Sequence, residues 1–247
     1  MELSPRLAAV AALVPPGARL ADVGTDHAYL PAYLILNGRI QRSIAADIRP
    51  GPLDHARRTA AEYHLADRLE FRLCDGLEHI APEECDTITI AGMGGETIAG
   101  ILDRARWTQN GKRLILQPQS TQNVLRSFLA HNGWRIVSER VVREGERWYP
   151  ILLVEGGAMR VLSPGEEIAG CPETWAGQEE RLGYLEWLLG QCQKQLHGLS
   201  RSSKPEDAAR RDTLLSAASF LKHHCLEWSH RSLTTSPGPC YNPPQMQ

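Results

Sequence analysis

The segment Asp22-Val23-Gly24-Thr25-Asp26-His27-Ala28-Tyr29-Leu30-Pro31 decides how this chain of 247 residues folds. It includes the end of the apolar run Arg19–Val23, which predicts a strand, and it opens a predicted helix over His27–Leu36. Ligands of open α/β sheets bind at such strand-to-helix turns, at the carboxyl ends of the strands. The segment therefore predicts an α/β fold with a ligand site at this turn.

Predicted strands and helices alternate on both sides of this segment. Ser4 and Pro5 are typical of a helix start, and Pro15 ends the short alanine-rich helix that they begin. The predicted strands are Arg19–Val23, Ser43–Ile48, Leu69–Leu73, Asp86–Ile90 and Arg113–Leu116, and the predicted helices are His27–Leu36, Leu53–His64, one beginning near Gly95, and Asn123–His131. This alternation predicts a parallel sheet with helices on both faces.

The pattern changes after His131. Trp134–Val142 and Trp148–Val154 are strand-like runs joined by a charged turn, so they predict an antiparallel hairpin. A doubly wound sheet that ends in a hairpin is the layout expected of class I methyltransferases, whereas dinucleotide-binding domains usually keep their sheet parallel to its edge. The predicted fold class is α/β, with a Rossmann-like class I methyltransferase domain over residues 1–157 and an antiparallel hairpin at the end of its sheet.

The C-terminal region predicts a separate helical domain. Residues 156–172 are rich in Gly and Pro and predict a linker. Two apolar heptad patterns follow, the first in Leu182, Leu185, Leu189, Cys192, Leu196 and Leu199, and the second in Leu214, Ala218, Leu221, Cys225 and Trp228. The short polar segment between them favours a coiled-coil-like helical hairpin over residues 173–228, and a monomer over a dimer zipper. Residues 229–247, with several prolines, predict a disordered tail.

Composition narrows the classes of protein to which the chain can belong. The formal net charge of −2 does not demand a polyanionic partner, and the longest apolar run, Leu7–Val14, is far shorter than the roughly 20 residues that span a bilayer. The six cysteines form no C-x-x-C pair, and the nine histidines show no spacing typical of metal ligands. We expect a cytoplasmic protein with reduced thiols, no membrane contact and no metal.

The turn segment discriminates between cofactors. A dinucleotide fingerprint needs G-x-G-x-x-G, but Asp26 and Tyr29 occupy the two glycine positions that follow Gly24. A carboxylate about 4 Å from a pyrophosphate costs on the order of 1 kcal/mol in water and several times more at an effective dielectric near 20. The same carboxylate favours a cationic sulfonium or ammonium, so the segment fits S-adenosyl-L-methionine better than NAD. A simpler explanation of Asp26 is that it caps the following helix.

Further acidic residues end the first three predicted strands. Asp22 ends the first strand, Asp47 the second, and Asp75-Gly76 follows the third. In this topology Asp47 accepts hydrogen bonds from ribose hydroxyls, and Asp75 lies beside the adenine amino group. Plainer explanations remain open, because Asp47 is also typical of a strand-end turn and Asp-Gly is a common turn in its own right.

The ends of the fourth and fifth strands predict the acceptor side of the site. Ala91-Gly92-Met93-Gly94-Gly95 ends the fourth strand, and its glycines let the backbone approach a flat ligand closely. Gln117-Pro118-Gln119 ends the fifth strand and offers amide groups that read a base edge by paired hydrogen bonds. A glycine-rich turn and loop amides without a chemical role are the alternatives.

The chain resembles the bacterial tRNA (adenine(22)-N1)-methyltransferase family, TrmK, in residues 22–31, Gly51-Pro52, Asp75-Gly76-Leu77, Ile90–Gly95 and Leu114–Pro118. The resemblance covers roughly residues 1–155 and implies methyl transfer from S-adenosyl-L-methionine to N1 of adenine 22 in tRNA. We hypothesise that Asp26 is the catalytic residue and that it stabilises the positive charge developing on the base or orients the cofactor. The predicted cofactor-binding residues are Asp22, Gly24, Asp26, His27, Asp47, Asp75, Gly76 and Gly92, and the predicted substrate-binding residues are Met93, Gly94, Gly95, Gln117, Pro118 and Gln119.

Two residues depart from the family pattern, and other functions remain open. Gln119 stands where the family usually has Asn, and Pro150 where it usually has an acidic residue. The near-neutral charge favours two alternatives, a small-molecule methyltransferase and an S-adenosyl-L-methionine-binding interaction protein that does not act on RNA. Steep salt dependence of tRNA binding discriminates the RNA enzyme from both. An NAD enzyme is disfavoured by Asp26 and Tyr29.

Overall fold

A computed structural model describes residues 1–175, 180–200 and 204–234 of the chain. The chain divides into two compact units, residues 1–180 and residues 181–247. No helix among the described residues is both long and apolar enough to cross a membrane.

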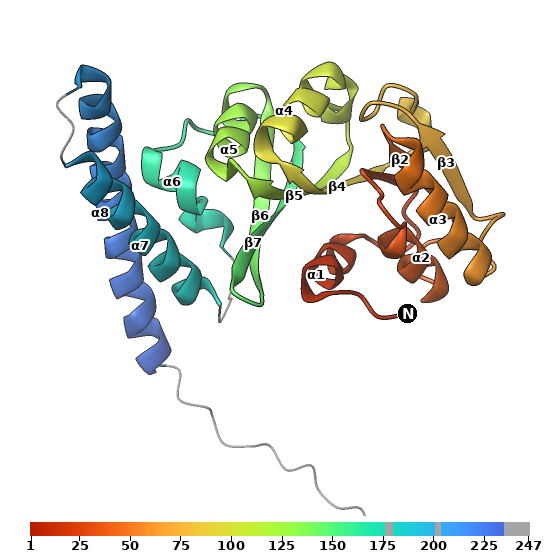
Figure 1. The fold of residues 1–247 in the computed structure, drawn as a ribbon, viewed down its shortest axis with the longest axis horizontal. Helices are drawn as coiled ribbons and strands as arrows, with labels where there is room; N and C mark the ends of the chain where they lie inside the picture. Colours follow the sequence, from red (N-terminus) through yellow and green to blue (C-terminus); the bar gives the residue numbers. More distant parts are fainter. Residues whose placement is uncertain (176–179, 201–203, 235–247) are drawn as a thin grey trace, which may run out of the picture. The chain divides into compact units, whose positions relative to one another are not determined.

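The first unit is built on a seven-stranded sheet with the order β3-β2-β1-β4-β5-β7-β6 (Figure 1). Its strands are β1 (Leu20–Val23), β2 (Ser43–Asp47), β3 (Leu69–Leu73), β4 (Thr87–Gly94), β5 (Arg113–Ser120), β6 (Trp134–Glu144) and β7 (Arg147–Gly156). Strands β1 to β5 pair in parallel, and β7 pairs antiparallel with both β5 and β6. The predicted class I methyltransferase sheet with a terminal antiparallel hairpin is therefore confirmed.

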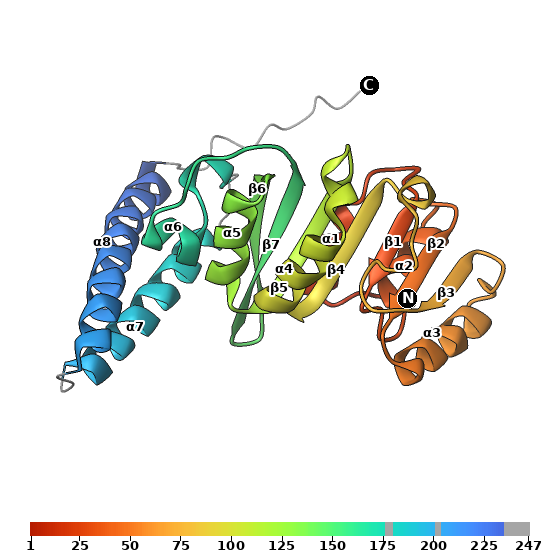
Figure 2. The same cartoon turned by 90° about the horizontal axis from the view of Figure 1, so that it is seen from above.

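Helices cover both faces of this sheet, and Figures 1 and 2 show α1, α2 and α3 on one face and α4 and α5 on the other. Their bounds are α1 (Pro5–Leu13), α2 (Tyr29–Leu36), α3 (Pro50–Glu62), α4 (Gly95–Arg104) and α5 (Gln122–His131). Short 3-10 turns lie at η1 (Pro82–Glu84), η2 (Arg106–Gln109) and η3 (Pro172–Thr174). Because strand side chains alternate between faces, Leu20 joins one hydrophobic cluster while Ala21 and Val23 join the other.

The N-terminal helix and the hairpin follow from local sequence. The Ser4 hydroxyl accepts a hydrogen bond from the Leu7 N–H at 3.5 Å, and Pro5 occupies the first turn of α1, as the sequence predicted. The hairpin strands run longer than predicted, so the turn contracts to Gly145 and Glu146, with Gly145 at φ +61°. A two-residue turn of this kind needs positive φ, which glycine adopts without strain.

The segment predicted as a linker is part of the first unit. Residues Pro164–Ala169 form helix α6, which begins with a capping box between Ser163 and Glu166. Beneath it, the buried Arg126 guanidinium donates to the carbonyl oxygens of Glu167 and Ile168 at 2.9 and 2.8 Å. The linker prediction was wrong for α6, because it relied on the Gly and Pro content of the segment and overlooked the capping box. The first compact unit ends at Glu180 rather than at residue 157.

The second unit consists of α7 (Arg181–Leu199) and α8 (Pro205–Thr234), which pack against each other. Arg211 donates from Nη2 to the Leu199 carbonyl oxygen at 2.9 Å, which ties the end of α7 to α8. Leu185, Cys192, Leu214 and Leu221 of the predicted seams are buried, but the packing also buries Leu188 and Ala217, so the contact is not a strict heptad seam. Helix α8 continues to Thr234, beyond the predicted tail start at residue 229, and residues 235–247 lie outside the described part of the chain.

Candidate cofactor and acceptor site

The turn after β1 is fixed by its own backbone. Gly24 adopts φ +78°, and the N–H groups of Gly24 and Thr25 both donate to the Ala46 carbonyl oxygen of β2, at 2.8 and 3.1 Å. Ala28 lies at φ +53° immediately before α2, so the helix begins at Tyr29 rather than at His27 as predicted. This turn directs residues 24–28 across the carboxyl end of the sheet.

Two buried carboxylates lie at the ends of neighbouring strands. Asp22 is 6% exposed and accepts a hydrogen bond from the Thr89 hydroxyl of β4 at 2.6 Å. Burial raises the pKa of the Asp22 carboxyl, and the hydroxyls of Thr25 and Thr89 oppose that rise. Asp47 is 7% exposed, and its Oδ1 accepts from the Arg49 backbone N–H at 2.9 Å. Asp22 thus carries a desolvation cost that a cationic ligand would relieve.

These carboxylates open into a cavity of about 470 Å³ at the carboxyl ends of β1, β2 and β4. It collects eight of the residues predicted from sequence, namely Asp22, Gly24, Asp26, His27, Asp47, Gly92, Met93 and Gln119. A somewhat larger hollow of about 510 Å³ lies at the opposite end of the strands, against Arg19, Ser43 and Leu69. We assign the ligand site to the cavity of about 470 Å³, because open α/β sheets bind ligands at the carboxyl ends of their strands.

Asp75 and Gly76 do not line this cavity. The Asp75 carboxylate accepts from Arg104 Nη2 at 2.9 Å and faces a different hollow of about 270 Å³. Gly76, at φ +61°, packs so tightly on Ile101 that an added Cβ would lie 2.9 Å from that side chain. In this arrangement the Asp75 carboxylate pairs with Arg104 outside the cavity, so the structure does not place it beside a ligand bound there.

Gln117 is turned inward, away from the cavity. It is fully buried, and its Oε1 accepts from Arg6 Nη1 at 2.8 Å and from the Gly92 N–H at 3.1 Å. Its Nε2 donates to the Pro118 carbonyl oxygen at 3.0 Å, so both ends of the amide are occupied. Gln117 and Pro118 therefore support the Gly92 turn from below, and Gln119 is the amide of this run that lines the cavity.

The glycine-rich end of β4 is packed closely on both sides. The Met93 side chain lies over Gly24, where an added Cβ would be 2.2 Å from the methionine methyl group. Gly95 is buried at the start of α4, and a Cβ there would lie 2.3 Å from the Thr121 carbonyl oxygen. Gly94 precedes it, with the Ser120 hydroxyl 3.2 Å from an added Cβ. Glycine at position 95 thus permits the close approach of α4 to the end of β5.

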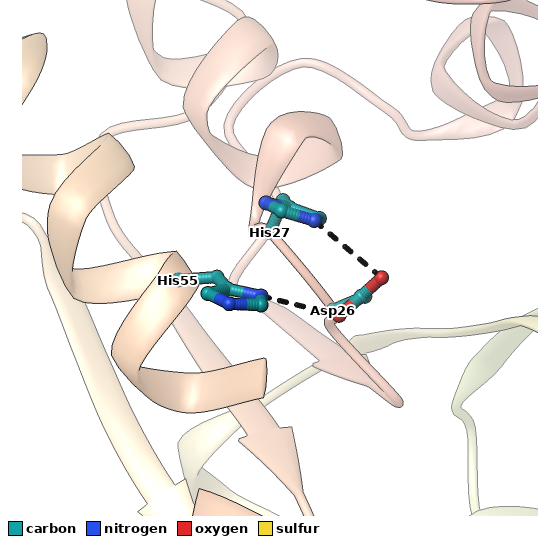
Figure 3. A group of neighbouring side chains, drawn as sticks. All are labelled: Asp26, His27 and His55. Atoms are coloured by element: carbon teal, nitrogen blue, oxygen red, sulfur yellow. Dashed lines mark ion pairs between the residues drawn. The ribbon is translucent and has the colours of Figure 1, made fainter. Parts of the chain in front are cut away.

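Asp26 stands at the cavity mouth beside two stacked imidazoles (Figure 3). Its carboxylate lies 3.6 Å from His27 Nε2 and 3.8 Å from His55 Nδ1. The His27 ring stacks on His55 on one side, with centroids 4.6 Å apart, and on Tyr29 on the other, at 5.0 Å. Asp26 does not cap α2 through its side chain, because no side-chain cap hydrogen bond is present at that helix start.

Sequence reasoning missed three residues of the site. Arg6 reaches the cavity from α1 and lies over the Tyr149 ring, and Arg49 reaches it from the turn before α3. His55 lies in helix α3, where it contacts the Asp26 carboxylate and stacks on His27. Arg6 and His55 lie in helices far from the turn in sequence, so no local motif marks them. Arg49 directly follows the second predicted strand, and that position could have identified it as a site residue from the sequence.

Comparison with known proteins agrees with this geometry. A methyltransferase-domain family profile matches residues 3–152. The chain is 41% identical over 158 residues to the Bacillus subtilis tRNA (adenine(22)-N(1))-methyltransferase, a match that covers 64% of this chain and 66% of that protein. The sequence matches thus span slightly less than two thirds of the curated relatives' lengths.

Solved structures match over nearly their whole length. The Bacillus subtilis M1A22 tRNA methyltransferase TrmK shares 32% identity with a TM-score of 0.78, over 91% of this chain and 99% of that one. Streptococcus pneumoniae Sp1610, solved in complex with S-adenosyl-L-methionine, shares 33% identity with a TM-score of 0.73, over 91% of this chain and all of that one.

Proposed function

Because the chain belongs to the TrmK family of methyltransferases, we propose that it transfers the methyl group of S-adenosyl-L-methionine to N1 of adenine 22 in tRNA. The observation that carries the proposal is the pair of buried carboxylates, Asp22 and Asp47, which open into one cavity at the strand ends. These side chains suit a ligand that carries positive charge and vicinal hydroxyls.

The residues at the cavity fit S-adenosyl-L-methionine. Asp22, whose ionised form is disfavoured by burial, gains a counter-ion from the α-ammonium group of the ligand. Asp47 binds the ribose hydroxyls, because its Oδ2 accepts no hydrogen bond from the described residues. The Gly24 turn and Gly92 bring backbone close to the ligand, and Asp26 and His27 close the cavity mouth.

For methylation at N1 of adenine, the main task of the protein is to align N1 with the methyl group and the sulfur of the cofactor. When bound, S-adenosyl-L-methionine supplies a methyl group already activated by its sulfonium. Neutral adenine has a lone pair on N1, so no residue is needed to remove a proton, and alignment alone supplies several kcal/mol. The product base is cationic, and Asp26 at the cavity mouth stabilises that charge as it develops.

The acceptor base enters between Gln119 and the residues that end β4. Since N1 is on the Watson–Crick edge, a paired adenine must leave its pair before it reacts. Gln119 offers both an amide donor and an acceptor at the cavity wall. Gln117 and Pro118 act beneath this surface, where the Gln117 amide holds the Gly92 N–H.

The helical unit of α7 and α8 contributes contacts to the tRNA backbone. The protein acts as a monomer, and it acts in the cytoplasm. Although the formal net charge is −2, contacts of basic side chains with phosphates should make the logarithm of tRNA affinity fall steeply with the logarithm of salt concentration, because the slope reports the number of phosphates neutralised. Affinity that is insensitive to salt would contradict contacts to the tRNA backbone.

The decisive experiment is methyl transfer from labelled S-adenosyl-L-methionine to unmodified tRNA, followed by nucleoside analysis and mapping of the modified position. We expect 1-methyladenosine at position 22 and no label on a tRNA in which adenine 22 is replaced by guanine. Cofactor binding without transfer to any tRNA would contradict the proposal. Asp26→Asn should lower cofactor affinity, turnover or both, and retention of both would remove the charge role of Asp26.

A further inference from the structure

His55 has no part in the methyl transfer proposed above, yet it lies against two residues of the cavity mouth. It comes from α3, whereas Asp26 and His27 come from the turn after β1, and Figure 3 shows both rings beside the Asp26 carboxylate. One ligand atom from each of the three residues lies within 4.8 Å of the other two. The sequence does not reveal this grouping, because His55 is remote from the turn along the chain.

The distances within this group fit a bound ion better than hydrogen bonds. Asp26 oxygens lie 3.6 Å from His27 Nε2 and 3.8 Å from His55 Nδ1, which is too long for hydrogen bonding. Bond lengths of about 2.0–2.2 Å to zinc place two ligand atoms of a tetrahedral ion roughly 3.3–3.5 Å apart. His55 Nδ1 is buried and has no hydrogen-bond partner in the described part of the chain. The two distances go to different oxygens of the Asp26 carboxylate, and ligand atoms of all three residues lie within 4.8 Å of one another, so the group is close to coordinating spacing and needs a small adjustment to reach it.

We infer that Asp26, His27 and His55 bind one divalent transition-metal ion of the zinc class, through two imidazole nitrogens and one carboxylate oxygen. Two imidazoles favour this class over magnesium and calcium, which prefer oxygen ligands. The Asp26 side chain is 66% exposed, so solvent reaches the remaining coordination position. This inference departs from the sequence-based expectation of no metal, which rested on spacing along the chain.

Metal binding requires a small rearrangement of the rings. His27 and His55 are stacked at an interplanar angle of 13°, and a ring nitrogen binds a metal in the plane of its own ring. The two parallel rings cannot both meet this condition, so the His55 ring turns as the ion enters. Its side chain is 44% exposed, which leaves room for the turn.

The ion and the cofactor share two residues. Asp26 and His27 line the cofactor cavity, and a bound cation neutralises the carboxylate that faces it. Zinc should therefore weaken binding of S-adenosyl-L-methionine and its product S-adenosylhomocysteine. This coupling rests on the proposed function, whereas metal binding by the free protein does not.

The test is calorimetric titration of the cofactor-free, full-length protein with Zn²⁺, repeated for His55→Phe, which keeps an aromatic ring against His27 but no ligand atom. The matched control is His64→Asn, an exposed histidine just after α3 whose φ of +55° asparagine tolerates. A second control, His223→Ala, removes a histidine of the exposed group on α8. Absorption of bound Co²⁺ reports the coordination geometry.

We expect one strong zinc site per chain, weakened at least tenfold by His55→Phe and unchanged by either control, because loss of even an outer-shell partner commonly costs 10–100-fold in metal affinity. We also expect zinc to weaken S-adenosylhomocysteine binding in the native protein but not in His55→Phe. Equal zinc affinity in His55→Phe and the native chain, or loss in His223→Ala instead, would overturn the site. Zinc binding without an effect on S-adenosylhomocysteine would instead contradict the shared cavity.

Discussion

Replacing Asp22 by Asn separates what this carboxyl does for stability from what it does for the cofactor. Asparagine has nearly the same shape and still accepts the hydrogen bond that the Thr89 hydroxyl donates at 2.6 Å. The change removes a charge from a position that is 6% exposed. Since burial raises the pKa of Asp22, the ionised carboxyl is less favourable in the folded chain than in the unfolded one.

The sign of the pH dependence follows from that shift. A carboxyl whose folded-state pKa is raised stabilises the fold fully below its unfolded pKa, and this contribution is lost as the pH rises through the folded pKa. Asp22→Asn does not titrate, so its stability relative to the native chain should increase from acidic to slightly alkaline pH. We expect a gain of about 1 kcal/mol at the alkaline end, at the lower limit of the cost of an imperfectly compensated buried polar group.

Cofactor binding should change in the opposite direction. A hydrogen bond to a charged group contributes about 1.5–3 kcal/mol, so Asp22→Asn should weaken S-adenosylhomocysteine binding by roughly 10–150-fold. Thermal unfolding at two pH values and calorimetric titration measure the two effects, and 1 kcal/mol corresponds to about 2–4 °C for a unit of this size. Asp54→Asn is the control, because Asp54 is exposed on α3 and pairs with Arg57 outside the cavity.

Two results would refute this reasoning. If Asp22→Asn is less stable than the native chain at every pH, the ionised carboxyl is a structural hydrogen-bond acceptor and carries no desolvation cost. If S-adenosylhomocysteine affinity is unchanged, Asp22 does not meet the cationic part of the ligand.

Three further predictions test the surroundings of the site. Gln117→Leu leaves the Gly92 N–H and the Arg6 guanidinium without their buried acceptor, so we expect a loss of about 1–3 kcal/mol in urea unfolding together with a fall in methyl-transfer rate. Gly95→Ala places a methyl group against backbone, 2.3 Å from the Thr121 carbonyl oxygen, and should cost about 1–3 kcal/mol, measured in the same way. Hydrogen bonds from Arg160 lower the pKa of Glu166 to about 2, so the stabilisation that the ionised Glu166 gives is present above pH 4.5 and is lost as the pH falls toward 2. Glu166→Gln should therefore cost about 1–2 kcal/mol at neutral pH and nothing in strong acid. The free energy of unfolding, measured as a function of pH, checks this expectation.

The strands and the terminal hairpin were predictable because each strand carries its own apolar pattern and the hairpin has its own turn signal. The positions of Asp22, Gly24 and Asp47 followed directly, since parallel strands bring their carboxyl ends to one edge. Their convergence on one cavity is a consequence of topology, which the alternation of strands and helices encodes.

The direction of individual side chains was not predictable in the same way. Gln117 and Gln119 are two residues apart on β5, so regular alternation alone would place both on one face. The register of β4 against β5 is irregular at this point, and only the partners Arg6 and Gly92 reveal that Gln117 is buried. Asp75 follows β3 as expected, yet its carboxylate pairs with Arg104 of α4. Both outcomes depend on residues brought close by folding, which no local pattern contains.

Pro150 illustrates how the sheet tolerates a residue that sequence rules place at strand edges. Proline lacks the N–H that a central strand donates on one of its sides. Strand β7 lies between β5 and β6, but its pairs with β5 end at Leu152, opposite Leu116, so no ladder hydrogen bond to β5 is lost at Pro150. The carboxylate expected there is absent, while Glu144, at the end of β6, accepts from the Arg6 N–H at 3.2 Å. Glu144 therefore supplies a carboxylate to the start of α1, whose Arg6 side chain lines the cavity, so a hairpin with proline at position 150 still provides an acidic contact to this helix.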